Sequence, residues 1–430
     1  MTQTIDKICV LGLGYIGLPT ASILATHGFE VLGVDVNPAV VDTLAAGRLH
    51  IKEPGLATVV KAAIHSRQLS VATAPAEAEA FIIAVPTPLR KDGEEPSVDL
   101  TYVRKATEAI APVLKKGNLV ILESTSPPGT TIEVVGEILS KTGLEAGKDF
   151  YLCHCPERVL PGKILRELTQ NDRIIGGINE ESAKRAEAMY RTFCGGDIFL
   201  TDCTTAELCK LVENSYRDVN IAFANELAAI SRKFSVDVYD VIRFANKHPR
   251  VDILNPGPGV GGHCISVDPW FLVEYASEES QLIRRARETN EARPLEVAEE
   301  ILSLCEKNNV ERVSVLGVTY KQDVDDTRES PSTAVIAGLK ARLGDANVLV
   351  HDPLVDSNAY EYPVDTLFNT ITDSEMVVFL VAHKEFGLID PGALGEIMKK
   401  RIVVDYMQSV DSAKWKDAGF EVFKMGQVRV

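Results

Sequence analysis

Cysteine is scarce in this sequence, with 8 residues in a chain of 430. The cysteines are scattered along the chain and do not form a framework of regular spacings. Small domains that depend on disulfides are much richer in cysteine and occur in oxidising compartments. The scarcity therefore argues against a disulfide scaffold, and we expect a cytoplasmic protein in a reducing environment.

Long apolar runs are also missing. No uninterrupted apolar stretch reaches the roughly 20 residues that a helix needs to cross a bilayer, so we expect no membrane insertion. The first apolar run, residues 8–13, has the form of a core strand, and we expect no signal peptide before it. Low-complexity segments and repeats of solenoid length are absent as well.

Basic side chains are outnumbered by acidic ones. The chain has 45 Lys and Arg against 61 Asp and Glu, so its formal net charge is 45 − 61 = −16. This balance argues against nucleic acid or an anionic membrane as the main partner. If the ligand is itself anionic, its basic contacts must be local. The length allows two or three domains, each with its own core.

A loop rich in glycine and proline carries the most conspicuous thiol. Residues 257–270 read Gly-Pro-Gly-Val-Gly-Gly-His-Cys-Ile-Ser-Val-Asp-Pro-Trp, a composition that rules out a regular helix or strand. Cys264 lies beside His263, with Asp268 four residues later. Because glycines let a backbone approach a ligand closely, Cys264 is a candidate nucleophile. A glycine-rich turn with an incidental thiol explains this stretch equally well.

A dinucleotide-binding pattern stands at the start of the chain. The strand at 8–13 leads into Gly12-Leu13-Gly14-Tyr15-Ile16-Gly17, a helix is expected at 18–27, and a strand at 31–35 ends in Asp35. The glycines would let backbone N–H groups and a helix N-terminus face a pyrophosphate. Asp35 would bind the ribose hydroxyls and repel a 2′-phosphate, which predicts NAD rather than NADP. A glycine-rich turn in an unrelated α/β domain is the alternative.

Two later buried strands, expected at 81–85 and 118–123, run into polar loops. In an open parallel sheet, loops at the carboxyl ends of strands line the ligand crevice. Thr87 and Thr125 are therefore candidate cofactor contacts, although either hydroxyl could serve a turn or a cap instead. Another short strand leads into Cys-His-Cys at 153–155. No second pair of ligands at zinc spacing appears, so we predict no metal site.

A long helix is expected from 204 to about 234, a segment without proline or glycine. The threonine that opens it and Glu207, three residues later, fit a capping box. Lys210, Asn214 and Arg217 fall at i, i+4 and i+7, so they share one face and suit a phosphate or an oxyanion. An ordinary solvated face fits equally well. Apolar residues around much of the helix need cover on more than one side, which predicts a homodimer or a dimer of dimers.

The last third of the chain repeats the first at low resolution. The corresponding segments are 312–320 with 7–15, 347–353 with 30–35, 376–381 with the strand at 81, and 402–405 with the strand at 119. We therefore predict an α/β fold with two Rossmann-like, doubly wound parallel-sheet domains joined by a helical middle region with a long helix. The predicted divisions are 1–203, 204–300 and 301–430.

Several motifs together resemble the UDP-glucose/GDP-mannose 6-dehydrogenase family over almost the whole chain. The matching stretches are GLGYIGLP at 12–19, VPTP at 85–88, STSPPGT at 124–130, CPERVLPG at 155–162, ELCKLVENSYRDVNIAFANE at 207–226, GVGGHC at 259–264 and YKQDVDDTRESPS at 320–332. The resemblance implies a double oxidation in which the 6-hydroxyl of a UDP-linked sugar becomes a carboxylate and two NAD are reduced. Residues 1–203 would then bind NAD, and residues 301–430 the UDP-sugar.

The resemblance also implies roles for particular residues. Cys264 would attack the aldehyde as a thiolate, giving a thiohemiacetal and then a thioester that water hydrolyses. Lys210 and Asn214 would stabilise the oxyanions, and Asp268 and Glu157 are candidate acid/base groups. To the NAD contacts Gly12, Gly14 and Gly17 it adds Tyr15, Ile16, Asp35, Thr87, Thr125 and Arg328. The implied contacts of the sugar nucleotide are Arg158, Val159, Lys210, Asn214, Arg217, His248, Arg250, Gly261, Tyr320 and Lys321.

Within the family, residues 248–251 and the thiol loop are most similar to members that oxidise UDP-N-acetyl-D-mannosamine. Members that act on UDP-glucose more often have Ser before the cysteine and Lys before the aspartate, where this chain has His263 and Val267. UDP-N-acetylglucosamine or UDP-glucose is the alternative substrate. A catalytically silent sensor of sugar nucleotides is the alternative outside enzymes, and the intact set of catalytic residues argues against it.

Overall fold

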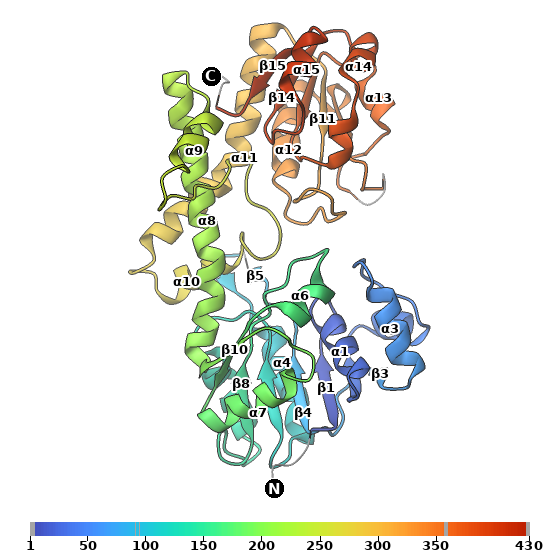
Figure 1. Ribbon diagram of the computed structural model, residues 1–430, viewed down its shortest axis with the longest axis vertical. Coiled ribbons are helices and arrows are strands. Elements are labelled where there is room, and N and C mark those ends of the chain that lie inside the picture. Colours follow the sequence, from blue (N-terminus) through green and yellow to red (C-terminus); the bar gives the residue numbers. More distant parts are fainter. Residues whose placement is uncertain (1–4, 91, 94, 357–359, 427–430) are drawn as a thin grey trace. The chain divides into compact units, whose positions relative to one another are not determined.

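The computed structural model describes residues 5–90, 92–93, 95–356 and 360–426 (Figure 1). The chain forms two compact units. Unit 1 comprises Met1–Glu213 and Glu274–Ala276, and unit 2 comprises Asn214–Val273 and Ser277–Val430. The division falls inside α8 (Cys203–Phe234) and inside α10 (Asp268–Tyr275), which therefore contribute residues to both units. Within the described ranges, no helix combines the length and apolarity that a bilayer crossing requires.

Unit 1 contains an eight-stranded sheet with the order β10-β9-β8-β7-β4-β1-β2-β3. Its strands are β1 (Lys7–Leu11), β2 (Glu30–Val34), β3 (Leu69–Ala72), β4 (Ala80–Ile83), β7 (Leu119–Leu122), β8 (Tyr151–His154), β9 (Arg173–Gly177) and β10 (Ile198–Asp202). From β3 to β8 all neighbours are parallel, whereas β9 pairs antiparallel with β8 and parallel with β10. The parallel part confirms the predicted Rossmann-like domain, and β9 and β10 extend it beyond the prediction. The short strands β5 (Leu89–Arg90) and β6 (Ser97–Val98) form a separate two-stranded antiparallel sheet.

Helices cover the sheet of unit 1, which explains why its central strands are apolar throughout. Every residue of β4 and β7 is buried, as expected for parallel strands covered on both faces. The covering helices are α1 (Gly17–Thr26), α2 (Pro38–Ala45), α3 (Leu56–His65), α4 (Thr101–Ile110), α5 (Glu137–Ser140), α6 (Ile164–Gln170) and α7 (Glu180–Tyr190), with η1 (Ala111–Val113) and the π-helix η2 (Thr130–Gly136). One core joins β1 with α1, α3 and α7.

Unit 2 contains a second, wholly parallel sheet with the order β12-β11-β13-β14-β15. Its strands are β11 (Val313–Leu316), β12 (Val348–His351), β13 (Met376–Phe379), β14 (Ile402–Asp405) and β15 (Glu421–Lys424). Four of these five strands fall in the segments that echo the start of the chain, so the second Rossmann-like domain is confirmed. Its helices are α12 (Pro331–Leu343), α13 (Leu367–Ile371), α14 (Pro391–Ile397) and α15 (Ser412–Asp417), with η3 (Asp345–Asn347) and η4 (Lys384–Leu388).

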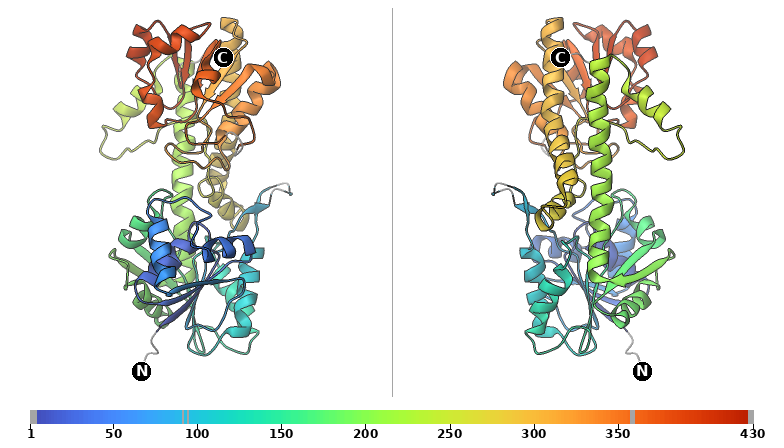
Figure 2. Two further views of the ribbon diagram at one scale, coloured as in Figure 1. Left: turned by 90° about the vertical axis from the view of Figure 1, so that its right-hand side faces the viewer. Right: turned by 90° about the vertical axis from the view of Figure 1, so that its left-hand side faces the viewer.

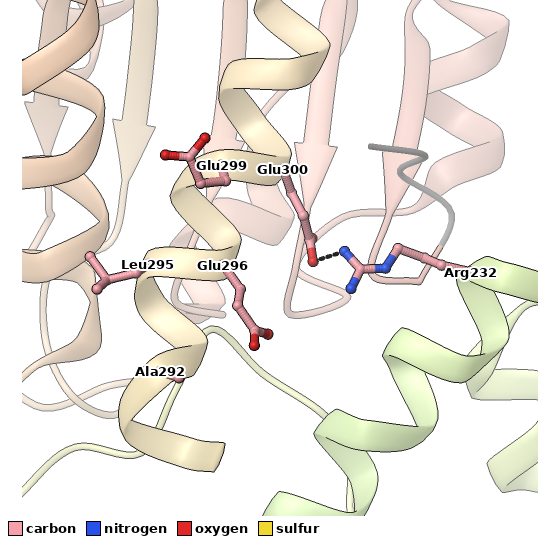
Figure 3. Close-up of a pocket in the computed structure, with 6 residues that line it drawn as sticks. All are labelled: Arg232, Ala292, Leu295, Glu296, Glu299 and Glu300. Carbon is pink, nitrogen blue, oxygen red and sulfur yellow. Dashed lines mark hydrogen bonds and ion pairs between the residues drawn. The ribbon is translucent and has the colours of Figure 1, made fainter. Parts of the chain in front are cut away.

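The remaining helices of unit 2 are α9 (Val238–Ala245) and α11 (Gln281–Asn308), together with the part of α10 up to Val273. The part of α8 that belongs to this unit runs beside α11 in the same direction (Figures 1 and 2). Near their carboxyl ends Arg232 of α8 forms an ion pair with Glu300 of α11, at an open groove between the two helices (Figure 3). Polar side chains therefore join the unit 2 part of α8 to α11.

The start of α8 differs from the predicted capping box of Thr204 and Glu207. The helix begins one residue earlier, at Cys203. The carboxylate of Asp202 accepts hydrogen bonds from the backbone N–H of Thr205 at 2.8 Å and from its hydroxyl at 2.7 Å. Asp202 is therefore the N-cap, and the capping-box prediction was wrong because Glu207 has other partners.

Candidate functional site

The turn after β1 has the geometry of a pyrophosphate site. Gly12 has φ of +92°, and a Cβ there would lie 2.5 Å from the carbonyl oxygen of Ala84. A Cβ on Gly17 would lie 1.8 Å from the carbonyl oxygen of Gly12. A Cβ on Gly14 would meet no atom of the described chain within 4 Å. Two glycines thus permit the tight turn and the close packing of α1, and the third leaves bare backbone for a ligand.

Asp35 follows β2 and lies against the same turn. Its carboxylate accepts hydrogen bonds from the N–H of Leu13 at 3.1 Å and from the N–H of Asn37 at 2.9 Å. The side chain is only partly buried, so further lone pairs remain for ribose hydroxyls. A ribose 2′-phosphate would meet this negative charge, which favours NAD over NADP.

The predicted threonines of the next two loops lie in contact. The Thr87 hydroxyl donates to the carbonyl oxygen of Thr125 at 2.8 Å, because β4 and β7 are neighbours in the sheet. The loop that carries Thr125 is fixed by Glu207 of α8, whose carboxylate accepts from the N–H of Gly129 at 2.6 Å and of Thr131 at 2.7 Å. These two residues precede Glu207 by 78 and 76 positions, so sequence spacing could not reveal the contact.

Glu157, a predicted acid/base group, lies in a buried ion pair. Its Oε2 is 3.0 Å from Nη2 of Arg173, and both side chains are more than nine-tenths buried. The guanidinium of Arg173 lies 4.7 Å from the centre of the Tyr190 ring. Arg173 was not predicted as a site residue, because it lies on β9, a strand that was not predicted either. Any catalytic role of Glu157 has to operate beside this cation.

A second carboxyl in the same cluster carried no sequence signal. Glu123 follows β7 directly and is fully buried. Its Oε1 accepts from the Tyr190 hydroxyl at 2.8 Å. The pKa of Glu123 is raised from 4.5 to about 7, chiefly by burial and also by the nearby Glu157, against the lowering effect of Arg173. The cluster therefore holds a carboxyl that titrates near neutral pH.

Three further predicted site residues, which are described by their contacts or burial, lie in unit 1. Arg158 forms an ion pair with Glu213 at 2.7 Å, and Val159 packs against the unit 1 core. Lys210 is 91% buried on α8, which is rare for a lysine outside an ion pair or a functional site. It lies one turn before Asn214, so the helix presents the two side chains on the same face.

Residues 257–267 of the thiol loop, in unit 2, contain neither helix nor strand, as predicted, whereas the last three residues of the loop, from Asp268, form the start of α10, which the composition did not predict. A Cβ on Gly261 would lie 2.6 Å from the carbonyl oxygen of Glu329, and one on Gly262 would lie 2.8 Å from the ring of Tyr320. These two glycines let the thiol loop pack closely on the segment that follows β11. The expected close approach of a ligand to the backbone of this loop stays a prediction.

Cys264 is the exposed cysteine of the chain, and the other seven are buried or partly buried. Asp268, four residues later, is 3% exposed and begins α10. Its Oδ2 accepts from Nδ2 of Asn214 at 2.5 Å. The fold thus brings together two of the predicted catalytic residues that are 54 positions apart in the sequence.

The segment after β11 carries other predicted contacts of NAD and sugar nucleotide. Thr319 donates to the carbonyl oxygen of Lys321 at 2.8 Å and lies 3.1 Å from Nε2 of His383. Nδ1 of His383 accepts from the N–H of Asp323 at 3.0 Å. The imidazole therefore holds the turn that contains Tyr320, a role that no local sequence pattern indicates.

Arg328 forms a two-pronged ion pair with Asp326, with N–O distances of 2.8 and 2.6 Å. The predicted sugar-nucleotide residues Arg217, His248 and Arg250 are exposed. His248 and Arg250 follow α9 and contact each other locally, since the N–H of Arg250 lies 3.4 Å from Nδ1 of His248. The ligand contacts assigned to these four residues stay predictions.

The second Rossmann-like domain has a counterpart of Asp35. Asp352 follows β12, and its Oδ2 accepts from the N–H of Val318 at 2.8 Å, as Asp35 accepts from Leu13. Asp352, however, is 3% exposed, and the same oxygen lies 3.1 Å from Nε2 of His383. The second acid is therefore closed to a ribose.

Among the described residues, no group of three His, Cys, Asp or Glu side chains is arranged to hold a metal. The Cys-His-Cys run at 153–155 is buried. Burial lowers the pKa of His154 to about 3 and raises that of Cys155 to about 12, as expected for groups held in their neutral forms.

The fold and these sites define a nicotinamide-dependent dehydrogenase with two Rossmann-like domains and an exposed cysteine on a fixed loop. Three domains of one family match the sequence: the NAD binding domain at residues 6–194, the central domain at 204–292 and the UDP binding domain at 314–412. The chain belongs to the UDP-glucose/GDP-mannose dehydrogenase family. It is accordingly an NAD-dependent UDP-sugar dehydrogenase that acts on a CH–OH group.

Relatives with assigned names match the full length of the chain. A UDP-N-acetyl-D-mannosamine dehydrogenase of Methanococcus maripaludis strain C7 is 51% identical over 98% of this chain and 97% of its own. The solved structure of UDP-D-ManNAc dehydrogenase from Pyrococcus horikoshii has a TM-score of 0.91 at 40% identity, covering 99% of this chain and 100% of that one. The solved structure of the UDP-N-acetyl-mannosamine dehydrogenase of Staphylococcus aureus has a TM-score of 0.89 at 42% identity, covering 98% of this chain and 99% of that one.

Proposed function

We propose that this chain oxidises the 6-hydroxyl of UDP-N-acetyl-D-mannosamine to a carboxylate and reduces two NAD. The observation that carries the proposal is an exposed cysteine on a fixed loop, in a chain whose full-length relatives bear that activity in their names. His263 and Val267, at positions that differ in members acting on UDP-glucose, support the same substrate.

The proposed chemistry has three steps. In the first, the 6-hydroxyl loses a proton and a hydride, NAD becomes NADH, and an aldehyde forms. In the second, the Cys264 thiolate adds to the aldehyde carbon, and the thiohemiacetal gives a hydride to a second NAD and becomes a thioester. In the third, water cleaves the thioester, which releases the carboxylate and restores the thiol.

Each of the other proposed catalytic residues has a part in these steps. Lys210 and Asn214 stabilise the oxyanions of the alkoxide and the thiohemiacetal. Asp268 orients Asn214 through the 2.5 Å hydrogen bond and is available for proton transfer. Glu157 is the second acid/base candidate, acting beside Arg173.

The binding roles follow the family pattern. NAD is proposed to contact Gly12, Gly14, Tyr15, Ile16, Gly17, Asp35, Thr87, Thr125 and Arg328. The UDP-sugar is proposed to contact Arg158, Val159, Lys210, Asn214, Arg217, His248, Arg250, Gly261, Tyr320 and Lys321. Residues 1–203, 204–300 and 301–430 would serve as NAD-binding, central dimerising and UDP-sugar-binding domains. The enzyme would work in the cytoplasm as a homodimer or a dimer of dimers.

A panel of sugar nucleotides tests the substrate. UDP-N-acetyl-D-mannosamine, UDP-N-acetylglucosamine, UDP-glucose and GDP-mannose would each be mixed with NAD and followed by NADH absorbance. A site that hydrogen-bonds one epimer leaves buried polar groups unpaired with the other, so we expect a clear preference in kcat/KM for the mannosamine. A preference for UDP-N-acetylglucosamine or UDP-glucose would refute this assignment.

Substitution of Cys264 tests the covalent step. Wild type should release two NADH per sugar, and Cys264→Ala should lose the net four-electron turnover while it still binds NAD and UDP-sugar. Cys264→Ser could trap an ester, because an alkoxide is a poorer leaving group than a thiolate, and intact-protein mass would show it. Near wild-type production of the uronic acid by Cys264→Ala would place the nucleophile elsewhere.

A further inference from the structure

The thiol loop is anchored at its start by a residue that the proposed chemistry does not use. Gly257 stands between Pro256 and Pro258, all three are buried, and neither proline has an amide hydrogen. The N–H of Gly257 is thus the one backbone donor of this tripeptide, and it donates to Oδ1 of Asn225 at 2.9 Å. Asn225 lies on α8 and is 2% exposed. A buried N–H needs such a partner, so this bond fixes the entry to the loop.

A chain of buried side chains between α8 and α11 sets the direction of that bond. The carboxylate of Asp218 accepts from Arg287 at 2.5 Å and from Nδ2 of Asn290 at 2.9 Å. With its nitrogen committed, Asn290 offers its oxygen to Nδ2 of Asn225, also at 2.9 Å. The oxygen of Asn225 is left to face Gly257. Because an amide has one donating and one accepting end, the acceptor at Asp218 orients both amides.

The same helix holds both ends of the thiol loop. Asn214 binds Asp268 after the cysteine, and Asn225 binds Gly257 before it. The two asparagines are eleven residues apart, which is three helical turns and returns to the same face of α8. Cys264 therefore lies on a segment whose entry and exit are tied to one rigid element.

We propose that Asn225 is a positioning residue for Cys264 and thereby for the second oxidation. The inference rests on the proposed role of the thiol. The first hydride transfer does not need the cysteine, whereas the second requires the thiohemiacetal. If the entry to the loop is released, the thiol captures the aldehyde less efficiently, and the aldehyde escapes. A variant with a general loss of stability would instead slow both oxidations together.

The experiment compares Asn225→Ala with wild type and with Asn118→Ala as a matched control. Asn118 is also a buried asparagine, 4% exposed, but it binds the backbone of Ala78 and Lys115 in unit 1. With UDP-N-acetyl-D-mannosamine and an aldehyde trap such as semicarbazide, NADH per sugar consumed should fall from two toward one in Asn225→Ala. Trapped aldehyde should rise roughly fivefold, the change that one lost hydrogen bond produces. The control should keep two NADH per sugar.

A second readout is independent of turnover. Hydrogen exchange at the Gly257 amide should quicken in Asn225→Ala, and the rate of iodoacetamide reaction at Cys264 should change, whereas Asn118→Ala should alter neither. If wild type itself fails to give two NADH per sugar, the proposed function is wrong, while the exchange measurement still tests the anchor. If Asn225→Ala yields two NADH per sugar and no trapped aldehyde, the inference is overturned. Should that variant not fold, Asn225→Ser provides the same test, because its hydroxyl is too short to reach Gly257.

Discussion

The buried carboxyl of Glu123 makes the stability of the fold depend on pH. Its carboxyl has a pKa of about 7 in the folded chain, chiefly because burial disfavours the charge, against 4.5 when exposed. Between these values the folded chain holds a proton that the unfolded chain has lost. The stabilising contribution of this group is therefore complete below the unfolded pKa and is lost as pH rises through the folded one.

We expect Glu123→Gln to remove this dependence. The amide keeps the oxygen that accepts from Tyr190 but cannot ionise. Relative to wild type, the free energy of unfolding of the variant should rise by roughly 2–3 kcal/mol between pH 5 and pH 8. Urea unfolding across that range measures the difference, and Glu108→Gln, an exposed site on α4, serves as control. If the free energies of unfolding of variant and wild type changed with pH in parallel, ionisation of Glu123 would cost the folded chain no free energy, and the prediction would be wrong.

At the scale of elements, the segment after β11 depends on one imidazole. His383 accepts from the N–H of Asp323 at one ring nitrogen and faces Thr319 and Asp352 with the other. It follows β13, so a neighbouring strand of the sheet positions the turn that carries Tyr320. Because Tyr320 packs against Gly262, the same imidazole indirectly supports the thiol loop.

We expect His383→Ala to weaken UDP-sugar binding selectively. Without the imidazole the turn with Tyr320 and Lys321 loses its support, so KM for the UDP-sugar should rise roughly tenfold, or ~1.4 kcal/mol. KM for NAD should change less, because Arg328 is the single proposed NAD contact in this segment and the proposed glycine cradle lies in unit 1. Steady-state kinetics with each substrate varied gives both values. The control is His351→Ala, whose ring binds the carbonyl oxygen of Asp365 in the same domain. An equal rise in both KM values would contradict the selective role.

Much of the fold was predictable because its central strands are continuous apolar runs, as in β4 and β7. The unpredicted elements have mixed local signals. β9 ends in two glycines, β10 is partly exposed, and α11 continues through Pro294, which lacks the amide hydrogen that a helix interior uses. Helix content in the middle region was therefore foreseen only in outline.

Residues of the candidate site could be predicted where they stand in sequence motifs. The residues that form hydrogen bonds or ion pairs with them could not. Cys264, Asp268 and Asn214 stand in recognisable stretches. Arg173 and His383 act through contacts with residues distant in sequence, and no local pattern marks them. Asn225 lies inside a matching stretch, but only the fold shows that it reaches Gly257.

At the scale of the molecule, α8 carries an apolar stripe that the single chain leaves exposed. Tyr216, Phe223 and Ile230 are 63%, 50% and 45% exposed and recur every seven residues. Such spacing keeps them on one side of the helix, in the pattern of a helix that packs against a partner. The stripe supports the proposed dimer.

We expect Phe223→Asp to weaken self-association, because it places a charge in the centre of this stripe. Light scattering of wild type at micromolar concentration should give at least a dimer mass, and the variant should shift toward the monomer. Phe368→Asp is the control, since Phe368 is 62% exposed on α13, away from the stripe in sequence. A monomer mass for wild type would exclude the dimer.

The paired acids Asp35 and Asp352 bear on attempts to change the cofactor. Both carboxylates tie down the N–H of the turn after the first strand of their domain, although only Asp35 stays open to a ribose. An acid at this position therefore stabilises the turn even where no nucleotide can reach it, as at Asp352. A redesign toward NADP that replaces Asp35 with a cation would therefore lose a structural tie together with the repulsive charge. Such a variant needs a new acceptor for the N–H of Leu13. Without one, a measured change in the preference between NAD and NADP would also reflect the loss of this hydrogen bond.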